Sequence, residues 1–332
     1  MGKLSSHALP SFDSKDRKIL YELEQDCRRS LGEIAERTGL SKQTLHYRMQ
    51  RLVDGGVIAG FITAIDPAKL GYVNHRVLMQ LGELDEAKRK VFLDFLIAHG
   101  NVSHVASCEG KFDIAITVLA ENLVQFNAIF RAILKEFPGR VKNHDVGMAY
   151  ELADYPRTHL ISDKKERKPA LASGEPKRIE LDGGDVRILS ALSKNARIPT
   201  IELADVAGLS PNTVRQKIRR LEKEGVIRRY TILLQHSRIG LQNYEMLIST
   251  QNLTDEDEKG IEDFCRMNDR VTSMRKGVGR WDIGIGFDAD SSAHFQEFLT
   301  GFRSRFSNLI REFEYVPILQ VHKLDHFPMR EI

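Results

Sequence analysis

Two stretches of the chain repeat apolar residues with the period of a helix, and each is followed by a short strand-like run. In residues 208–230, three apolar residues recur at intervals of four and three positions, namely Val214, Ile218 and Leu221. This spacing places them on one helical face. Ser210 can cap the helix by accepting from free backbone N–H groups, and Pro211 suits its first position. The pattern predicts the second helix of a helix-turn-helix, followed by a wing at 226–230.

The same pattern occurs 169 residues earlier in the chain. Residues 16–71 match residues 185–240 at 17 of 56 positions without a gap. The offset persists further on, where Gly110 and Asp113 match Gly279 and Asp282. A constant offset over so long a stretch indicates that one two-domain unit has been duplicated in tandem.

The polar faces of the two predicted helices carry residues that suit DNA. Residues 210–230 contain seven Lys/Arg and two Asp/Glu (7 − 2 = +5), and residues 41–61 contain three and one (3 − 1 = +2). Arg, Asn and Gln can read base edges in a major groove, and cations can bind phosphates. A solvated basic helix is the alternative interpretation. We predict contacts to double-stranded DNA from Lys42, Gln43, His46, Tyr47, Arg48, Arg51, Asn212, Arg215, Gln216, Arg219, Arg220, Arg228 and Arg229.

After each wing the apolar period changes. In the first copy, strand-like and helical runs follow in the order strand, helix, strand, strand, helix, strand, at 73–81, 85–100, 102–108, 114–119, 123–137 and 141–152. This order is typical of a ferredoxin-like βαββαβ domain. Two helices would cover one sheet face and leave an apolar face open, so these modules are expected to pair with one another, within or between chains.

The predicted fold class is therefore α+β, with two copies of a winged helix-turn-helix followed by a ferredoxin-like domain. Residues 1–13 and the end from 325 are expected to be unstructured, and the prolines and charges of the connector argue against a packed element there. The predicted segments are 14–61 (first winged helix-turn-helix), 62–152 (first ferredoxin-like domain), 153–183 (linker), 184–230 (second winged helix-turn-helix) and 231–332 (second ferredoxin-like domain).

Composition narrows the function classes. Three cysteines lie far apart and lack a Cys-x-x-Cys motif, so we expect reduced thiols in a cytoplasmic protein and no disulfide or zinc site. No apolar run is long enough for a membrane span. Only His322 and His326 are spaced like a metal pair, and solvated side chains explain them better. The chain also lacks a P-loop, a dinucleotide fingerprint and a nucleophile elbow, and no cofactor or metal is predicted.

The motifs resemble those of the Lrp/AsnC ("feast/famine") transcription regulators. The resemblance rests on Gly39-Leu40-Ser41, Gly56-Val57-Ile58 and their second copies, and on Gly110…Phe112-Asp113-Ile114 and Gly279…Trp281-Asp282-Ile283. It implies winged DNA-binding domains joined to sensors that bind a small effector, an amino acid or a similar molecule, at their interfaces. Gly110, Asp113, Gly279 and Asp282 are the predicted effector-binding residues, and the alternative is that each aspartate caps its own turn.

Two other functions are compatible with this architecture. Siroheme decarboxylases share it and can be fused in tandem, and Val102-Ser103-His104 faintly resembles their Val-Thr-His segment. The turn Gly110-Lys111-Phe112-Asp113 departs from that family's Tyr-Asn-x-Trp-Phe-like run. A pure interaction module with a degenerate first helix-turn-helix is the third possibility. We predict a regulator that is not an enzyme.

Overall fold

The computed structural model describes residues 12–83, 85–161, 167–173 and 178–327. Its first helix-turn-helix consists of α1 (Ser14–Gln25), α2 (Leu31–Thr38) and α3 (Lys42–Asp54), and its second of α6 (Gly183–Lys194), α7 (Thr200–Ala207) and α8 (Pro211–Lys223). Ser210 caps α8, as predicted, and the equivalent Ser41 caps α3. Gly39 and Gly208 both adopt positive φ, so α2 and α7 end in equivalent tight turns.

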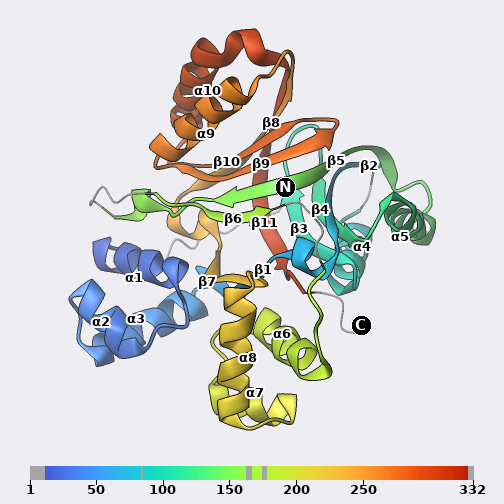
Figure 1. The fold of residues 1–332 in the computed structure, drawn as a ribbon. Helices are drawn as coiled ribbons and strands as arrows, with labels where there is room; N and C mark the ends of the chain where they lie inside the picture. The colour runs from blue at the N-terminus through green and yellow to red at the C-terminus, as the bar shows by residue number, and fades with distance from the viewer. Residues whose placement is uncertain (1–11, 84, 162–166, 174–177, 328–332) are drawn as a thin grey trace.

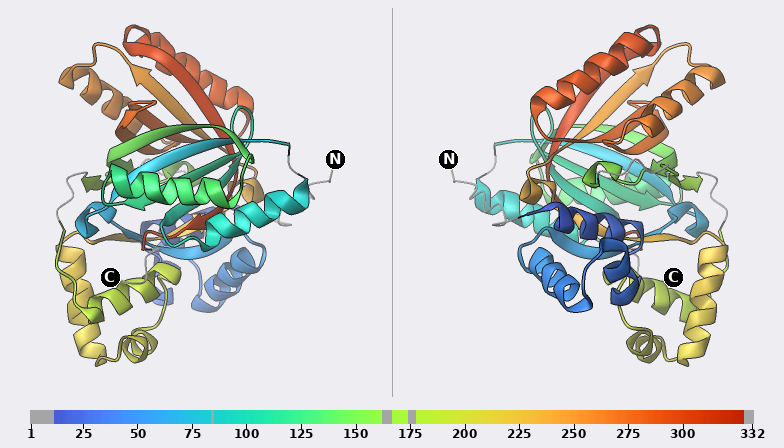
Figure 2. Two further views of the ribbon diagram at one scale, coloured as in Figure 1. Left: turned by 90° about the vertical axis from the view of Figure 1, so that its right-hand side faces the viewer. Right: turned by 90° about the vertical axis from the view of Figure 1, so that its left-hand side faces the viewer.

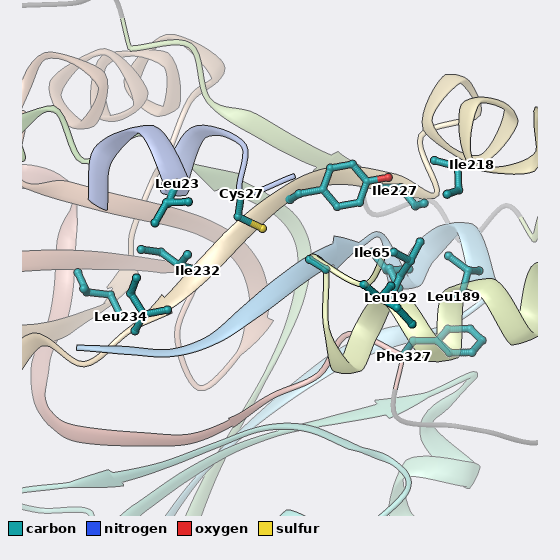
Figure 3. Packing of buried hydrophobic residues seen from close by; sticks show 14 of the residues in the cluster. Leu23, Cys27, Ile65, Leu189, Leu192, Ile218, Ile227, Ile232, Leu234 and Phe327 are labelled. Carbon is teal, nitrogen blue, oxygen red and sulfur yellow. The ribbon is translucent and has the colours of Figure 1, made fainter. Parts of the chain in front are cut away.

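The two wings pair with each other. Strand β1 (Ile58–Ile65) runs antiparallel to β7 (Ile227–Leu234), so each helix-turn-helix contributes one strand to a shared ribbon. One apolar core spans both units, and Figure 3 shows side chains from α1, β1, α6, α8 and β7 converging along this ribbon. The two helix-turn-helix units therefore share one core. Strands β1 and β7 also run across the boundaries predicted at 61 and 230.

Each copy continues into a ferredoxin-like module with the predicted element order, which confirms the fold class. The first contains β2 (Val73–Leu81), α4 (Glu86–Ala98), β3 (Val102–Cys108), β4 (Ile114–Ala120), α5 (Leu123–Glu136) and β5 (Val141–Asp154). The second contains β8 (Gln242–Thr250), α9 (Asp255–Met267), β9 (Val271–Gly279), β10 (Ile283–Ala289), α10 (Ser292–Phe306) and β11 (Ile310–Leu324). Short 3₁₀ segments, Pro67–Leu70 and His236–Ile239, join the wings to these modules.

The two modules close into one ring of eight strands. Two long strands join them, because β5 pairs with β2 of its own module and with β9 of the other, while β11 pairs with β8 and with β3. The strand order is β2-β4-β3-β11-β8-β10-β9-β5, with β5 returning to β2. The modules thus pair within one chain, through both edges of each sheet, with their inner faces turned toward each other.

Three separate cores fill this part of the molecule. Helices α4 and α5 cover the outer face of the first sheet, and α9 and α10 cover that of the second. Figures 1 and 2 show these helical layers on the flanks of the ring, with both helix-turn-helix units on one side of it. A smaller cluster inside the ring contains Leu78, Phe112, Leu247 and Trp281. The apolar face that would otherwise be open is buried by the partner module.

The connector and the C-terminal end are packed where they are described, so the expectation of an unpacked linker was wrong there. Strand β6 (Ala170–Ser173) pairs with the end of β5, and Tyr155, Leu160 and Arg167 are buried. Phe327 is buried too, against the shared helix-turn-helix core. The predicted unstructured residues 1–11, most of the charged run at 164–168 and residues 328–332 lie outside the described residues. Within the described ranges, every helix is too short or too polar to cross a bilayer.

Candidate DNA-binding surface and sensor site

The exposed faces of α3 and α8 hold most of the residues predicted to read DNA. Eight of them are exposed, namely Lys42, Gln43, His46 and Tyr47 in α3 and Asn212, Arg215, Gln216 and Arg219 on α8. The apolar faces of the same helices are buried in the shared core, which fixes their rotation. The 169-residue offset aligns His46 with Arg215 and Gln50 with Arg219. The two surfaces are therefore built alike but differ in charge.

Three of the predicted DNA contacts are occupied by internal ion pairs. Arg48 and Arg51 bind the fully buried carboxylate of Asp16 at 3.0 and 2.6 Å, and Arg220 binds the equivalent Asp185 at 2.5 Å. These cations fix the third helix of each unit against its first. Sequence reasoning did not foresee this role, although the aspartates precede the arginines at one constant spacing in both copies. This arrangement does not favour the predicted contacts between these three arginines and DNA.

The two wing arginines lie inside the protein. The Arg228 side chain is only 4% exposed and bonds Asp154 of β5 at 3.3 Å, and Arg229 lies 3.6 Å from the same carboxylate. The wing pairs with its counterpart from the other copy, so it does not project as a free hairpin. The prediction that Arg228 and Arg229 bind DNA phosphates does not fit this geometry, because their charges are directed toward the ring.

The Gly-x-aromatic-Asp turns hold the ends of neighbouring strands. Gly110 and Gly279 adopt φ of 99° and 121°, which glycine tolerates best. The Asp113 carboxylate accepts from the Leu81 backbone N–H at 2.8 Å, and the Asp282 carboxylate accepts from the Thr250 N–H and hydroxyl at 2.6 and 2.9 Å. These bonds tie each turn to the end of a strand 32 residues earlier and do not cap the turn itself, and they occupy one oxygen of each predicted ligand group.

The two turns nevertheless converge on one open hollow of about 300 Å³. The residue after each glycine reaches it, with Lys111 bonding Glu314 at 3.2 Å and Arg280 bonding Glu312. Both cations also approach Asp145, at 3.2 and 3.6 Å. Burial opposes the charge of Lys111, but its bonds to Glu314 and Asp145 together outweigh burial and raise its pKa. The Trp281 ring forms part of the wall. Sequence reasoning named the turns but missed these cations.

The remaining candidates have structural partners. His322 bonds the Ser107 hydroxyl at 2.8 Å, and His326 lines a cavity inside the ring, so the pair does not form a joint site. Cys27, Cys108 and Cys265 are buried free thiols, and burial raises the pKa of each to about 12. At neutral pH they are therefore protonated packing residues.

Comparison with known proteins agrees with this arrangement. A family model for winged helix-turn-helix DNA-binding domains matches residues 12–59 and 181–228. The proline dehydrogenase transcriptional activator of Rhizobium radiobacter is 31% identical over 137 residues, covering 40% of this chain and 86% of the relative. The HTH-type transcriptional regulator FL11 of Pyrococcus abyssi is 28% identical over 134 residues, covering 40% and 87%. Each relative thus matches about one of the two units.

The fold and these matches define a winged helix-turn-helix, DNA-binding transcription regulator. The chain belongs to the Lrp/AsnC family. The crystal structure of the siroheme decarboxylase NirDL with an iron-uroporphyrin III analogue matches 95% of this chain and 96% of its own, with a TM-score of 0.58 and 15% identity. At this identity the match shows a shared tandem fold.

Proposed function

We propose that this chain is a sequence-specific regulator that applies two unequal recognition helices to one DNA site. The observation that carries the proposal is the β1–β7 ribbon, which joins both helix-turn-helix units in one core. A symmetric dimer reads two equal half-sites. Here α8 exposes Arg215 and Arg219 where α3 exposes His46 and Gln50. We expect an asymmetric operator in which the half-site under α8 contributes most of the specificity.

Selection from a randomised duplex library, followed by anisotropy titrations, tests this proposal. Arg215→Ala is expected to relax base preference in one half-site by about 1–3 kcal/mol, because arginine reads guanine with two hydrogen bonds. The matched variant His46→Ala is expected to have a smaller effect in the other half-site. Equal affinity of the parent for selected and random duplexes would refute specific binding. Equal losses in both variants would refute the asymmetry alone.

We infer further that the hollow between the two turns binds the effector, a zwitterionic amino acid. Lys111 and Arg280 can bind a carboxylate, while Glu312 and Glu314 can bind an ammonium group. The Trp281 ring offers an apolar surface for a side chain. The Rhizobium relative is described as an activator for proline dehydrogenase, which supports a link to amino-acid metabolism. A ligand here would contact both modules and could change how they sit beneath the DNA-binding units.

Calorimetry with the twenty amino acids tests the effector proposal. Arg280→Met is expected to weaken binding. Arg303→Met is the control and is expected to leave binding unchanged, because Arg303 is an exposed arginine on α10 and does not line the hollow. Binding that survives Arg280→Met and Lys111→Met would place the site elsewhere. We also propose that the protein is not an enzyme. Added iron tetrapyrrole is therefore expected to show no absorption band of a protein-bound form and to yield no decarboxylated product. Either signal would favour the decarboxylase alternative.

A further inference from the structure

A second cavity lies inside the ring, below the wing ribbon. Its volume is about 200 Å³, and its polar wall includes Arg76, His104, Asp154, Arg229, Arg275 and His326. These residues come from both modules, the wing and the C-terminal end. The volume is below the roughly 300–1,000 Å³ usual for drug-sized ligands. The space therefore suits a small polar molecule and is separate from the hollow at Lys111 and Arg280.

Cations outnumber carboxylates around this cavity. Glu245 receives both Arg76 and Arg275, at 2.5 and 2.7 Å. Asp154 likewise receives Arg229 from the cavity wall and Arg228, which does not line the cavity. Four guanidinium groups thus share two carboxylates. A fifth, that of Arg157, also reaches the cavity, but Asp288 and Glu24 bind it from outside the cavity wall. The cluster around Glu245 and Asp154 keeps an excess of two positive charges.

Several buried donors in this cluster have no partner. The Nε–H groups of Arg76, Arg228 and Arg229 donate to no described residue. Arg76 lines the cavity and its side chain is only 8% exposed, so its guanidinium group is largely shielded from bulk water. An unpaired buried donor is costly, and several of them in one cluster are unusual in a folded protein. An oxyanion in the cavity would offset the excess positive charge of this cluster through charge-assisted hydrogen bonds.

The two cavity histidines add polar groups without adding charge. Burial, followed by the nearby Arg76 and Arg275, holds the pKa of His104 well below its ordinary value. Burial and then Arg228 lower the pKa of His326 to about 4. Arg76 donates to Nδ1 of His104 at 2.8 Å, so the proton of that neutral ring is on Nε2. Both rings are therefore neutral hydrogen-bonding groups beside an excess of arginine charge.

We propose that this cavity binds a small oxyanion, with a phosphate or carboxylate group held by Arg76, Arg229 and Arg275. Arg229 belongs to wing strand β7, whereas Arg76 and Arg275 belong to the two modules. The anion would therefore contact the wing ribbon and both ferredoxin-like modules at once. The inference depends on neither of those proposals.

Inorganic phosphate is the test probe, with the full chain at constant ionic strength set by sodium chloride. Thermal unfolding is expected to shift upward with phosphate and to saturate, because a ligand of the native state stabilises it. In ³¹P NMR, the phosphate line should broaden when the parent protein is added. It should sharpen again when citrate or sulfate displaces the phosphate. Citrate competing better than phosphate would identify a carboxylate as the preferred source of the anion.

Arg229→Gln is expected to weaken phosphate binding roughly tenfold or more, since a hydrogen bond to a charged group is lost. Arg303→Gln, a change to an exposed arginine of α10, is expected to bind as the parent does. Circular dichroism establishes that Arg229→Gln is folded, and Arg275→Gln serves as a second variant. No saturable shift and no line broadening with the folded parent would overturn the proposal. Equal binding by parent and both cavity variants would also overturn it.

Discussion

At the scale of single residues, Gly147 shows how closely the two modules approach. It lies on β5, and a Cβ atom there would be 2.8 Å from Cε2 of Trp281, a ring of the other module. Trp281 is buried in the cluster inside the ring, so it has little room to move. The absence of a side chain at 147 therefore permits the indole to fill the interior.

Gly147→Ala is expected to lower the free energy of unfolding by about 1–3 kcal/mol, as overpacked cores do. Gly301→Ala is the matched control, because it lies within α10 and its Cβ would meet nothing within 4 Å. That change should be neutral or stabilise by up to about 1 kcal/mol, since alanine favours a helix. Urea unfolding measures both. Equal behaviour of the two variants would contradict the packing argument.

The His326 side chain should make the stability of the fold depend on pH. Its pKa falls from 6.5 to about 4, chiefly by burial, then by Arg228; Asp154, Asp325 and the Thr63 backbone oppose the shift. The unfolded chain therefore binds a proton at higher pH than the folded one. Stability from this group is present above about pH 6.5 and is lost as pH falls toward 4.

His326→Gln is expected to reduce the loss of stability between pH 6.5 and 4, measured by urea unfolding at several pH values in chloride buffers. Other buried histidines, among them His104, have lowered pKa values too, so the variant should reduce the slope without removing it. A slope identical to that of the parent would show that His326 titrates normally in the folded protein.

At the scale of elements, each helix-turn-helix is fixed by one aspartate at the start of its first helix. Asp185 takes part in the capping box of α6 and receives Lys217 and Arg220 from α8 at 3.2 and 2.5 Å. Asp16 has the same role toward α3. The recognition helix is thus held to the first helix by charge as well as by its apolar face.

Asp185→Asn is expected to destabilise the chain by about 1–3 kcal/mol, because buried bonds to two cations lose their charge. Its DNA affinity should fall to a similar degree for all sequences, since α8 keeps its base-reading side chains but loses its fixed orientation. Anisotropy titrations on selected and random duplexes separate this result from that of Arg215→Ala. A change in base preference alone would assign Asp185 a different role.

The element scale is also where the sequence was most informative. The ranges predicted for β2 and β3 are those observed, because short apolar runs bounded by turn residues are local signals. The pairing of β1 with β7 could not be predicted. Alternation of apolar and polar residues indicates that a strand is half-buried, but it does not identify the strand with which it pairs, here one 169 residues away. For the same reason Arg228 looked like a phosphate contact, although its strand is turned inward.

At the scale of the whole molecule, duplication has allowed equivalent positions to become complementary. Arg76 and Glu245 are 169 residues apart, so they occupy the same position in the two copies, and they form an ion pair inside the ring. In a symmetric dimer of either unit, this position would meet an identical residue of like charge. The sequence contains both residues and the offset, but only the ring places them in contact. The pair therefore favours pairing of unlike modules.

This asymmetry gives a prediction with a defined order of effects. Glu245→Met leaves Arg76 and Arg275 inside the ring without their shared carboxylate, whereas Arg76→Met leaves Glu245 still bound to Arg275 at 2.7 Å. Breaking a buried pair from one side typically costs about 3–5 kcal/mol when a charge is stranded. We expect a loss of this order for Glu245→Met, measured by urea unfolding, and a clearly smaller loss for Arg76→Met. The reverse order would contradict the view that excess arginine charge collects around Glu245. Added phosphate should restore part of the stability lost by Glu245→Met if the anion replaces the missing carboxylate.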